Sequence, residues 1–537
     1  MFVFEWIVGV LFGAVLLAAL ARKCGVPYPA FLAMGGVGLA FAPGVPNLKL
    51  DPELALALFL APVLLDAGYD TSLRDLRANW RPIAGLALGA VGVTTIAVAV
   101  VVKVLVPDVP ISAAIVLGAV VAPPDAVAAL SVLRHVNLPH RLATILRGES
   151  LLNDASALLI YRLGVAAAAS GTLVPSDLWP AFLIGVVGGL TAGPVLGVIS
   201  LRLMRIFEDP ATTIVLQFVL AFGIWLVAER LGLSGVLTVV SYAITVARHA
   251  PEQTSPRKRI VSYAVWDTAI FVLNVLAFVL IGNQIGPILE GLGPQQRLSY
   301  GLVAGAVTVT VVLVRIAWVV PASGIRRIGF SRGATGKSSV LGVGTEFERG
   351  LAHERLGSPD LGPMAGLAVA WAGMRGLVTI ATALALPDEG PGFPYRDLIV
   401  LTAFSVVIGT LVLQGLTLRP LLAWLRLEDD DPVGHEVGWG RAEAYSAAID
   451  SLDGDETEGA EVLRQEFRTA LEEAEIDEKG LASEGLPADA ARRRAITAAR
   501  DRVLHMRRDG LIGDDAYYVL EQEFDWAELS VTPREDA

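Results

Sequence analysis

Hydrophobic residues in this chain gather into stretches of about twenty residues, separated by short segments rich in proline, glycine or charge. An α-helix of that length crosses the roughly 30 Å hydrocarbon core of a bilayer. The pattern predicts an all-α polytopic membrane protein. We expect about thirteen transmembrane helices, at residues 3–21, 27–44, 52–68, 82–106, 111–133, 142–169, 179–204, 211–228, 232–247, 261–285, 297–320, 363–386 and 397–425.

Composition agrees with this pattern. Of the 537 residues, 54% are hydrophobic, and the mean hydropathy is +0.59. The single cysteine, Cys24, excludes an intrachain disulfide and a cysteine metal cluster. The N-terminus is apolar from its start and lacks a basic segment, which is typical of a first spanning helix and not of a cleaved signal.

Lysine and arginine indicate which ends of these helices face the cytoplasm. With the C-terminus inside, nearly all basic loop residues fall on the inner side, as the positive-inside rule requires. The outer side then holds only Lys49, Lys103, Arg230, Arg297 and Arg396. We therefore expect the N-terminus outside and the C-terminus in the cytoplasm.

The charge changes abruptly near Leu427. Residues 428–537 contain 30 acidic and 12 basic residues, whereas the preceding part is net basic. We expect a transmembrane domain at 1–427 and an acidic, helical cytoplasmic tail at 428–537. Apolar stripes at helical spacing in the tail predict a small helical module, and no dinucleotide fingerprint accompanies them.

The predicted helix 142–169 carries a polar stripe in an otherwise apolar sequence. Glu149 and Asn153 are four residues apart, and Ser150 and Asp154 lie one position further round the same helix. Such a stripe in a membrane helix faces protein or water, because exposing it to lipid is costly.

Two other predicted helices should be interrupted near their middles. Pro123 and Pro124 remove backbone donors from helix 111–133, just before Asp125, and should free carbonyl oxygens for a cation. Gly373 and Gly376 flank Arg375 in helix 363–386. If helices 1–6 and 8–13 form two inverted six-helix repeats, the interrupted helices 5 and 12 are equivalent and cross at the midplane site of a transporter.

Together, GESLLNDASAL, APPDAVAAL, LLDAGYDTSLRDLR, FVLNVLAFVLIG and WAGMRGLVTIATALALP resemble the cation:proton antiporter-1 family, the sodium/proton exchangers. The resemblance covers all thirteen predicted helices. It implies a secondary antiporter for Na⁺ (or Li⁺) and H⁺ that acts in pH homeostasis. It further implies a homodimer in the cell membrane, without a cofactor or a nucleic-acid partner.

The resemblance also implies roles for individual residues. Asp154 is similar to the main cation and proton carboxylate, Asn153 to its amide partner, and Ser150 and Asp125 to further ligands of Na⁺. Many members have threonine where this chain has Pro124, which leaves only backbone carbonyls there. Glu149 and Arg375 look like a structural ion pair.

A buried carboxylate resists ionisation, whereas a nearby cation favours the ionised form. Asp154 can therefore hold a cation or a proton in turn, and we expect electroneutral exchange of one cation per proton. K⁺/H⁺ exchange is the alternative within the class. A cation channel needs a continuous pore, and an intramembrane enzyme needs a catalytic dyad or metal ligands that the helices lack.

Several charged residues keep more than one interpretation. Arg315 is a packing or snorkelling arginine, or the partner of a buried carboxylate. Asp66 belongs to a solvated helix end or to a gate. Arg147 reaches the inner surface, and the sequence indicates no role for Arg162.

Overall fold

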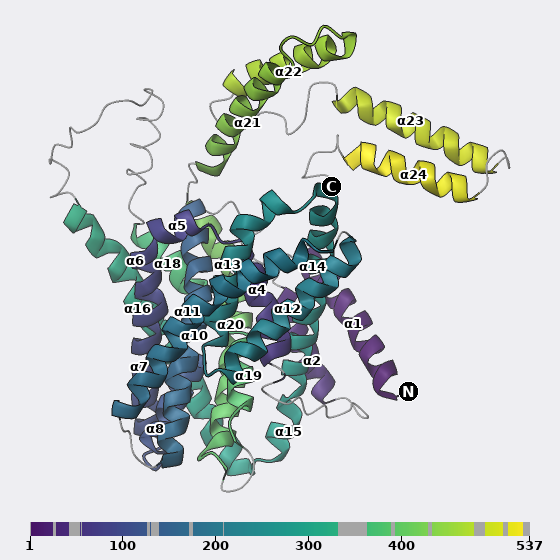
Figure 1. Cartoon of the computed structure of the whole chain (residues 1–537). Coiled ribbons are helices and arrows are strands. Elements are labelled where there is room, and N and C mark those ends of the chain that lie inside the picture. The colour runs from purple at the N-terminus through teal and green to yellow at the C-terminus, as the bar shows by residue number, and fades with distance from the viewer. Residues whose placement is uncertain are drawn as a thin grey trace. The chain divides into compact units, whose positions relative to one another are not determined.

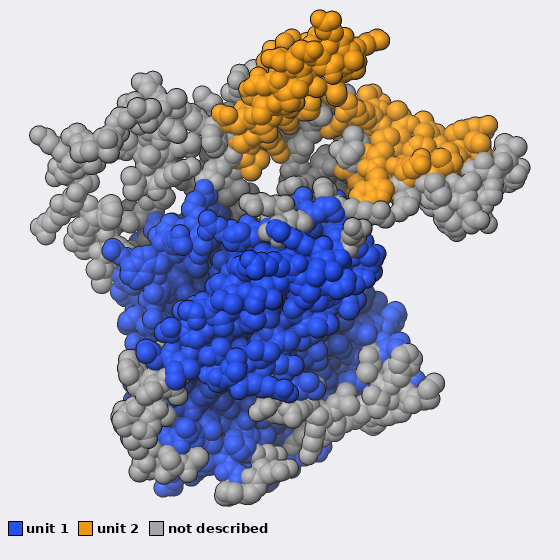
Figure 2. Space-filling view, in the orientation of Figure 1, with its two compact units in different colours: residues 1–428 blue, residues 429–537 orange. Residues whose placement is uncertain are grey.

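The structure is a computed structural model of the whole chain, and all the regular elements that it describes are helices. It describes residues 2–24, 28–41, 54, 56–125, 129, 139–170, 175–207, 209–330, 362–387, 392–427, 432–476, 489–508 and 514–529. The chain divides into two compact units, Met1–Glu428 and Asp429–Ala537, coloured separately in Figure 2.

The first unit is a bundle of long helices with several shorter pieces between them (Figure 1). In chain order its elements are α1 (Phe2–Cys24), α2 (Tyr28–Ala40), η1 (Leu56–Leu60), α4 (Ala61–Tyr69), α5 (Leu73–Ala78), α6 (Trp80–Ala84), η2 (Gly85–Ala90), α7 (Val91–Leu105), α8 (Ile111–Val121), α10 (His140–Ser170), α11 (Pro175–Met204), α12 (Pro210–Arg230), α13 (Gly235–Gln253), α14 (Pro256–Asn283), α15 (Ile285–Glu290), α16 (Pro294–Phe330), α18 (Pro363–Trp371), α19 (Leu377–Leu384) and α20 (Arg396–Leu425).

Seven helices in the described part of the chain are long and apolar enough to cross a membrane. They are Trp80–Leu105, His140–Ala168, Leu183–Met204, Pro210–Arg230, Lys258–Leu280, Pro294–Ala322 and Arg396–Leu425. Four further apolar helices are shorter: Val8–Ala21, Tyr28–Ala40, Leu56–Tyr69 and Ile111–Val121. These helices make the chain an integral membrane protein, while thirteen spans in two inverted repeats remain a prediction.

Large apolar side chains cover the outside of this unit. Ile96 and Val104 of α7, Leu226 of α12 and Leu302 of α16 are each at least half exposed. On a water-soluble protein this much exposed apolar surface would drive aggregation, whereas lipid solvates it at no cost.

Glycines allow some of these helices to pack backbone against backbone. A Cβ atom at Gly36 of α2 would lie 2.4 Å from the carbonyl oxygen of Val279 in α14, and one at Gly282 would lie 2.4 Å from that of Ala33. Small residues at such contacts are typical of helix pairs in membranes, where close packing replaces the hydrophobic effect.

The π-helical segment η2 receives a side chain from α16. The indole Nε1 of Trp318 donates to the carbonyl oxygen of Gly85 at 3.1 Å, and its ring lies against Gly89, where a Cβ atom would approach it to 2.5 Å. A π-helical turn displaces carbonyls from the regular ladder, so an outside donor is needed there. This contact fixes α16 beside the span that begins at Trp80.

The second unit contains α21 (Pro432–Ser451), α22 (Glu458–Ile476), α23 (Asp489–Arg508) and α24 (Asp514–Leu529). The last three cover the apolar stripes seen in the sequence, whereas α21 was not predicted. Tyr445 and Phe467 pack with ring centroids 5.9 Å apart, and Arg492 pairs with Glu466 at 2.7 Å. Arg500 joins α23 to α24 through ion pairs with the residues Asp525 and Glu528.

Candidate cation and proton site

Helix α10 buries the polar stripe that the sequence singles out. Glu149, Asn153 and Asp154 are 1%, 0% and 6% exposed, and Ser150 is partly buried one turn before Asp154. The stripe thus faces the interior of the bundle, as expected from the cost of placing such groups in lipid. Four polar side chains on adjacent positions of one helix therefore line a buried site.

Opposite this stripe, α8 ends at Val121 and residues 122–125 leave the helical path. Pro123 and Pro124 cannot donate, so the helical ladder stops there. The backbone N–H of Asp125 instead donates to the carbonyl oxygen of Met374 at 2.6 Å. The predicted break in this helix is therefore present, and it contacts the second predicted break directly.

That second break separates α18 from α19, with residues 373–376 outside either helix. Arg375 is 1% exposed and donates back across the crossing, from Nε to the carbonyl oxygen of Val121 at 3.2 Å and from Nη2 to that of Ala122 at 3.4 Å. Its backbone N–H donates to the hydroxyl of Thr410 in α20 at 3.0 Å. The two broken segments thus satisfy each other's backbone groups, as they must where water is excluded.

Asn153 joins α10 to this crossing. Its Nδ2 donates to the carbonyl oxygen of Pro124 at 2.9 Å, and its buried Oδ1 accepts no hydrogen bond from any described residue. A buried amide oxygen without a donor is costly, unless a cation or a water molecule occupies the adjoining space. The Pro124 carbonyl, predicted as a cation ligand, is engaged by Asn153.

Asp154 and Asp125 directly follow Asn153 and Pro124, which are joined by this hydrogen bond, so the two carboxylates belong to one site. Asp125 lies directly over Gly376, where a Cβ atom would come within 1.6 Å of its Oδ2. Only a residue without a side chain leaves room for the carboxylate there. Gly376 therefore sets the position of Asp125, a role that spacing in the sequence does not show.

The predicted ion pair between Glu149 and Arg375 is wrong, because Glu149 pairs with another arginine. The guanidinium of Arg315 takes both oxygens of Glu149, at 2.6 and 2.8 Å, and both side chains are at most 2% exposed. The guanidinium of Arg375 is instead turned toward the carbonyls of Val121 and Ala122, which the break after α8 has freed.

Arg315 is also fixed from its other side. Its Nε and Nη2 donate to the carbonyl oxygens of Ala370 and Val369 at 3.2 Å each, and it lies against Gly373. A Cβ atom at Gly373 would come within 2.1 Å of Nε. Of the two interpretations left open, the structure selects the partner of a buried carboxylate.

Other charged residues lie elsewhere. Arg162 pairs with Glu229 of α12 at 2.6 Å, with half of the arginine side chain exposed. Arg147 is exposed, and Asp66 lines a separate cavity. In the described residues no group of three histidine, cysteine or acidic side chains is arranged to hold a metal ion. The candidate site therefore consists of two carboxylates and an amide beside two broken helices.

Known proteins resemble this chain over most of its length. The family model described as sodium/hydrogen exchanger, transmembrane, matches residues 10–424. An uncharacterized Na⁺/H⁺ exchanger of Mycobacterium tuberculosis is 30% identical over an alignment of 558 residues, gaps included, which covers 98% of each chain. The sodium, potassium, lithium and rubidium/H⁺ antiporter of Bacillus subtilis is 31% identical over 412 residues, covering 74% of this chain and 58% of that protein.

A solved structure has the same fold. The sodium proton antiporter MjNhaP1 of Methanocaldococcus jannaschii superposes with a TM-score of 0.56 at 17% identity, over 77% of this chain and 98% of that one. At this identity the likeness concerns the fold alone, and the family match carries the assignment. The chain belongs to the sodium/hydrogen exchanger family, whose members are cation:proton antiporters.

Proposed function

We propose that this protein exchanges Na⁺ (or Li⁺) for H⁺ across the membrane, with Asp154 carrying the cation and the proton in turn. The observation that carries the proposal is the burial of Asp154, which is 6% exposed beside the break that holds Asp125. A carboxylate in this position is costly to leave bare, so it favours a bound cation or a bound proton. Ser150 and Asp125 are the further proposed ligands of the cation.

The charges around the site support electroneutral exchange. The site and its crossing contain three acidic groups, Asp154, Asp125 and Glu149, and two guanidinium groups, those of Arg315 and Arg375. With every group ionised, this cluster has one negative charge in excess. One monovalent cation or one proton neutralises it, so both loaded forms have the same charge.

Potassium exchange is the second candidate. Pro124 has no hydroxyl group, so its position offers a cation only backbone oxygen, and Asn153 already occupies that carbonyl. The Bacillus subtilis relative is named for transport of sodium, potassium, lithium and rubidium. A site with few fixed ligands imposes its size weakly, which would accommodate K⁺ as well as Na⁺.

We propose the remaining organisation on the same basis. Residues 1–427 form the transport domain, with two inverted six-helix repeats that cross at helices 5 and 12, in a homodimer of the cell membrane. The distribution of basic residues among the loops supports a cytoplasmic C-terminal unit. The two mutually bonded breaks, between Asp125 and Met374 and between Arg375 and Val121, support such a crossing.

The experiment is proton flux in everted membrane vesicles on addition of NaCl, LiCl or KCl. We expect the wild type to dissipate the imposed pH gradient. Asp154→Asn should do so only at the background rate, because an amide carries no proton. The matched control is Asp108→Asn, which changes an exposed aspartate in a turn before α8 and should transport normally. No response of the wild type to any of the three cations would refute the proposal.

A further inference from the structure

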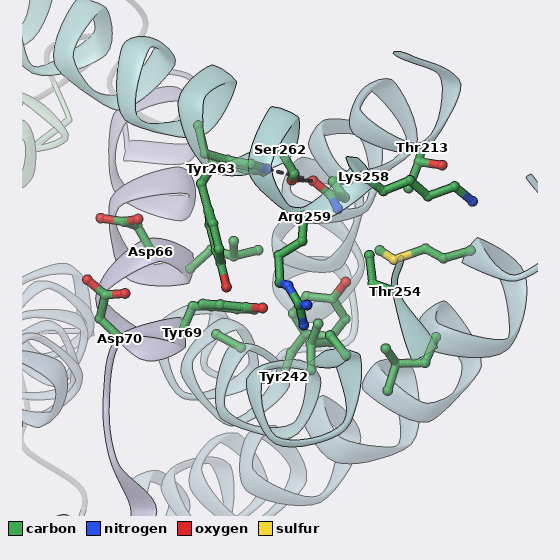
Figure 3. A pocket seen from close by; sticks show the side chains of 18 of the residues that line it. Asp66, Tyr69, Asp70, Thr213, Tyr242, Thr254, Lys258, Arg259, Ser262 and Tyr263 are labelled. Atoms are coloured by element: carbon green, nitrogen blue, oxygen red, sulfur yellow. Dashed lines mark hydrogen bonds between the residues drawn. The ribbon is translucent and has the colours of Figure 1, made fainter. Parts of the chain in front are cut away.

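A cavity of about 550 Å³, lined by both polar and apolar residues, lies apart from the two broken helices (Figure 3). Its walls are the ends of α4, α11 and α13 and the beginnings of α12 and α14. None of its lining residues belongs to α8, α10, α18 or α19, which build the transport site. These helix ends adjoin the basic connections that the positive-inside rule assigns to the cytoplasmic side, so we expect the cavity at the depth of the lipid headgroups.

Basic side chains reach this cavity from the start of α14. In Figure 3 the guanidinium of Arg259 extends into its centre, toward Tyr69 and Tyr242. Lys258 also lines the cavity, and its Nζ donates to the carbonyl oxygen of Phe207 at 2.7 Å, which secures the adjoining turn. Arg205 adds a third positive charge.

Hydroxyl groups surround Arg259. The rings of Tyr69 and Tyr263 meet edge to face with centroids 6.1 Å apart, and both residues line the cavity. Gln217 on the neighbouring wall accepts from Trp266 Nε1 and Ser262 Oγ at 2.8 Å each, which fixes its amide. Guanidinium, ammonium and phenol groups together are the donors that hold a phosphate.

Acidic residues line the cavity as well, but on other sides. In Figure 3 the carboxylates of Asp66 and Asp70 point to the left, away from the guanidinium of Arg259. Asp267 is exposed. The lining as a whole contains three acidic and three basic residues, and Arg259 is the basic residue that Figure 3 shows at the centre of the cavity.

The rest of the wall is apolar, with Leu65, Leu201, Val246 and Trp266 among its residues. The volume of the cavity far exceeds that of one phosphate ion. A phosphate ion alone would therefore leave the apolar wall in contact with water. An amphiphile can contact both the basic and hydroxyl groups and the apolar wall. We propose that this cavity binds a membrane phospholipid through the phosphate of its headgroup, with Arg259 as the central contact and the glycerol and first acyl carbons against the apolar wall.

The test is thermal unfolding of the purified full-length protein in detergent, titrated with four probes. These are short-chain phosphatidylglycerol, short-chain phosphatidylethanolamine, the matching diacylglycerol and inorganic phosphate. We expect both phospholipids to raise the midpoint in a saturable manner, because they share the phosphate, and the other two probes to have no effect. An equal rise with diacylglycerol would mean that the cavity binds acyl chains only, and an equal rise with inorganic phosphate would identify free phosphate as the occupant; either overturns the proposal.

Variants locate the binding. We expect Arg259→Gln to weaken the phospholipid effect by about tenfold or more, as loss of a charge-assisted hydrogen bond predicts. Tyr69→Phe keeps the ring and removes one hydroxyl, so it tests the site even if Arg259→Gln unfolds. The control is Arg74→Gln, an exposed arginine of α5 outside the cavity. Wild-type phospholipid binding by both Arg259→Gln and Tyr69→Phe would contradict the assignment.

Discussion

Arg315 and Glu149, which are 166 residues apart in sequence, form a bidentate ion pair in the interior of the bundle. The pair ties α10, which carries Asp154, to α16, and the same guanidinium holds the last carbonyls of α18. One buried arginine thus fixes the helix with the proposed ion carboxylate against the first half of a broken helix.

Removing one partner of this pair should destabilise the protein strongly. We expect Arg315→Ala to lower the free energy of unfolding by about 3–5 kcal/mol, because Glu149 then keeps a buried charge without a partner. The measurement is thermal unfolding in detergent. The matched control is Arg162→Ala, which breaks the ion pair of equal length with Glu229, but at an exposed site where we expect less than about 1 kcal/mol. Similar losses in the two variants would show that the interior pair has no special role.

A methyl group at residue 376 should slow transport strongly without removing a charge. In Gly376→Ala the new Cβ would overlap Asp125, so the carboxylate or the broken backbone must move by more than 1 Å. Displacements of this size at a reacting group cost on the order of a hundredfold in rate. We expect cation-dependent proton flux to fall by about that factor. Gly305→Ala is the control, since nothing lies within 4 Å of its added Cβ, and normal flux in Gly376→Ala would rule out the placement of Asp125.

A second carboxylate next to Asp154 should change the stoichiometry of charge. Asn153→Asp adds one negative charge to the buried cluster. The variant then takes up two protons to become neutral, whereas it still binds one Na⁺, so the exchange moves net charge. We therefore expect transport by this variant in proteoliposomes to respond to an imposed membrane potential, while wild-type transport does not. A wild type that responds to the potential would contradict electroneutral exchange, whatever the variant does.

The start of α12 should become less stable in acid. The carboxylate of Asp209 accepts from the backbone N–H of Thr212 at 2.8 Å and from its hydroxyl at 3.0 Å, and these bonds hold the pKa of Asp209 below its usual 3.8. A folded-state pKa below the unfolded one stabilises the protein above the unfolded value, and this stabilisation is lost as the pH falls through the folded value. The difference in unfolding midpoint between wild type and Asp209→Ala should be constant near neutrality and shrink below pH 3.8. A difference that is independent of pH would show that the carboxylate charge is not involved.

Much of the architecture could be predicted from the sequence, because each membrane helix corresponds to one continuous apolar stretch. The apolar stretches, the break at Pro123 and Pro124 and the buried polar face of α10 all follow from residue type and spacing. The family followed from motifs around the same residues, and the comparisons confirm it.

The partners of the buried charges could not be predicted in this way. Sequence spacing shows that Arg315 and Arg375 must both find acceptors, but not which one reaches Glu149. That choice depends on the direction of the backbone within the second break, where Arg375 is turned toward the end of α8. The same applies to Gly376, whose role is visible only once Asp125 lies above it. The glycines beside Arg375 were the one available signal.

The carbonyl ends of the two interrupted helices have a further consequence. The last carbonyls of α8 and the next residue accept from Arg375, and those of α18 accept from Arg315. Each half-helix would otherwise direct the negative end of its macrodipole at the site. The guanidinium groups of Arg375 and Arg315 compensate these two negative ends. A cation or proton that enters the proposed site therefore meets the carboxylates of Asp154 and Asp125 and not the bare carbonyl ends of two half-helices.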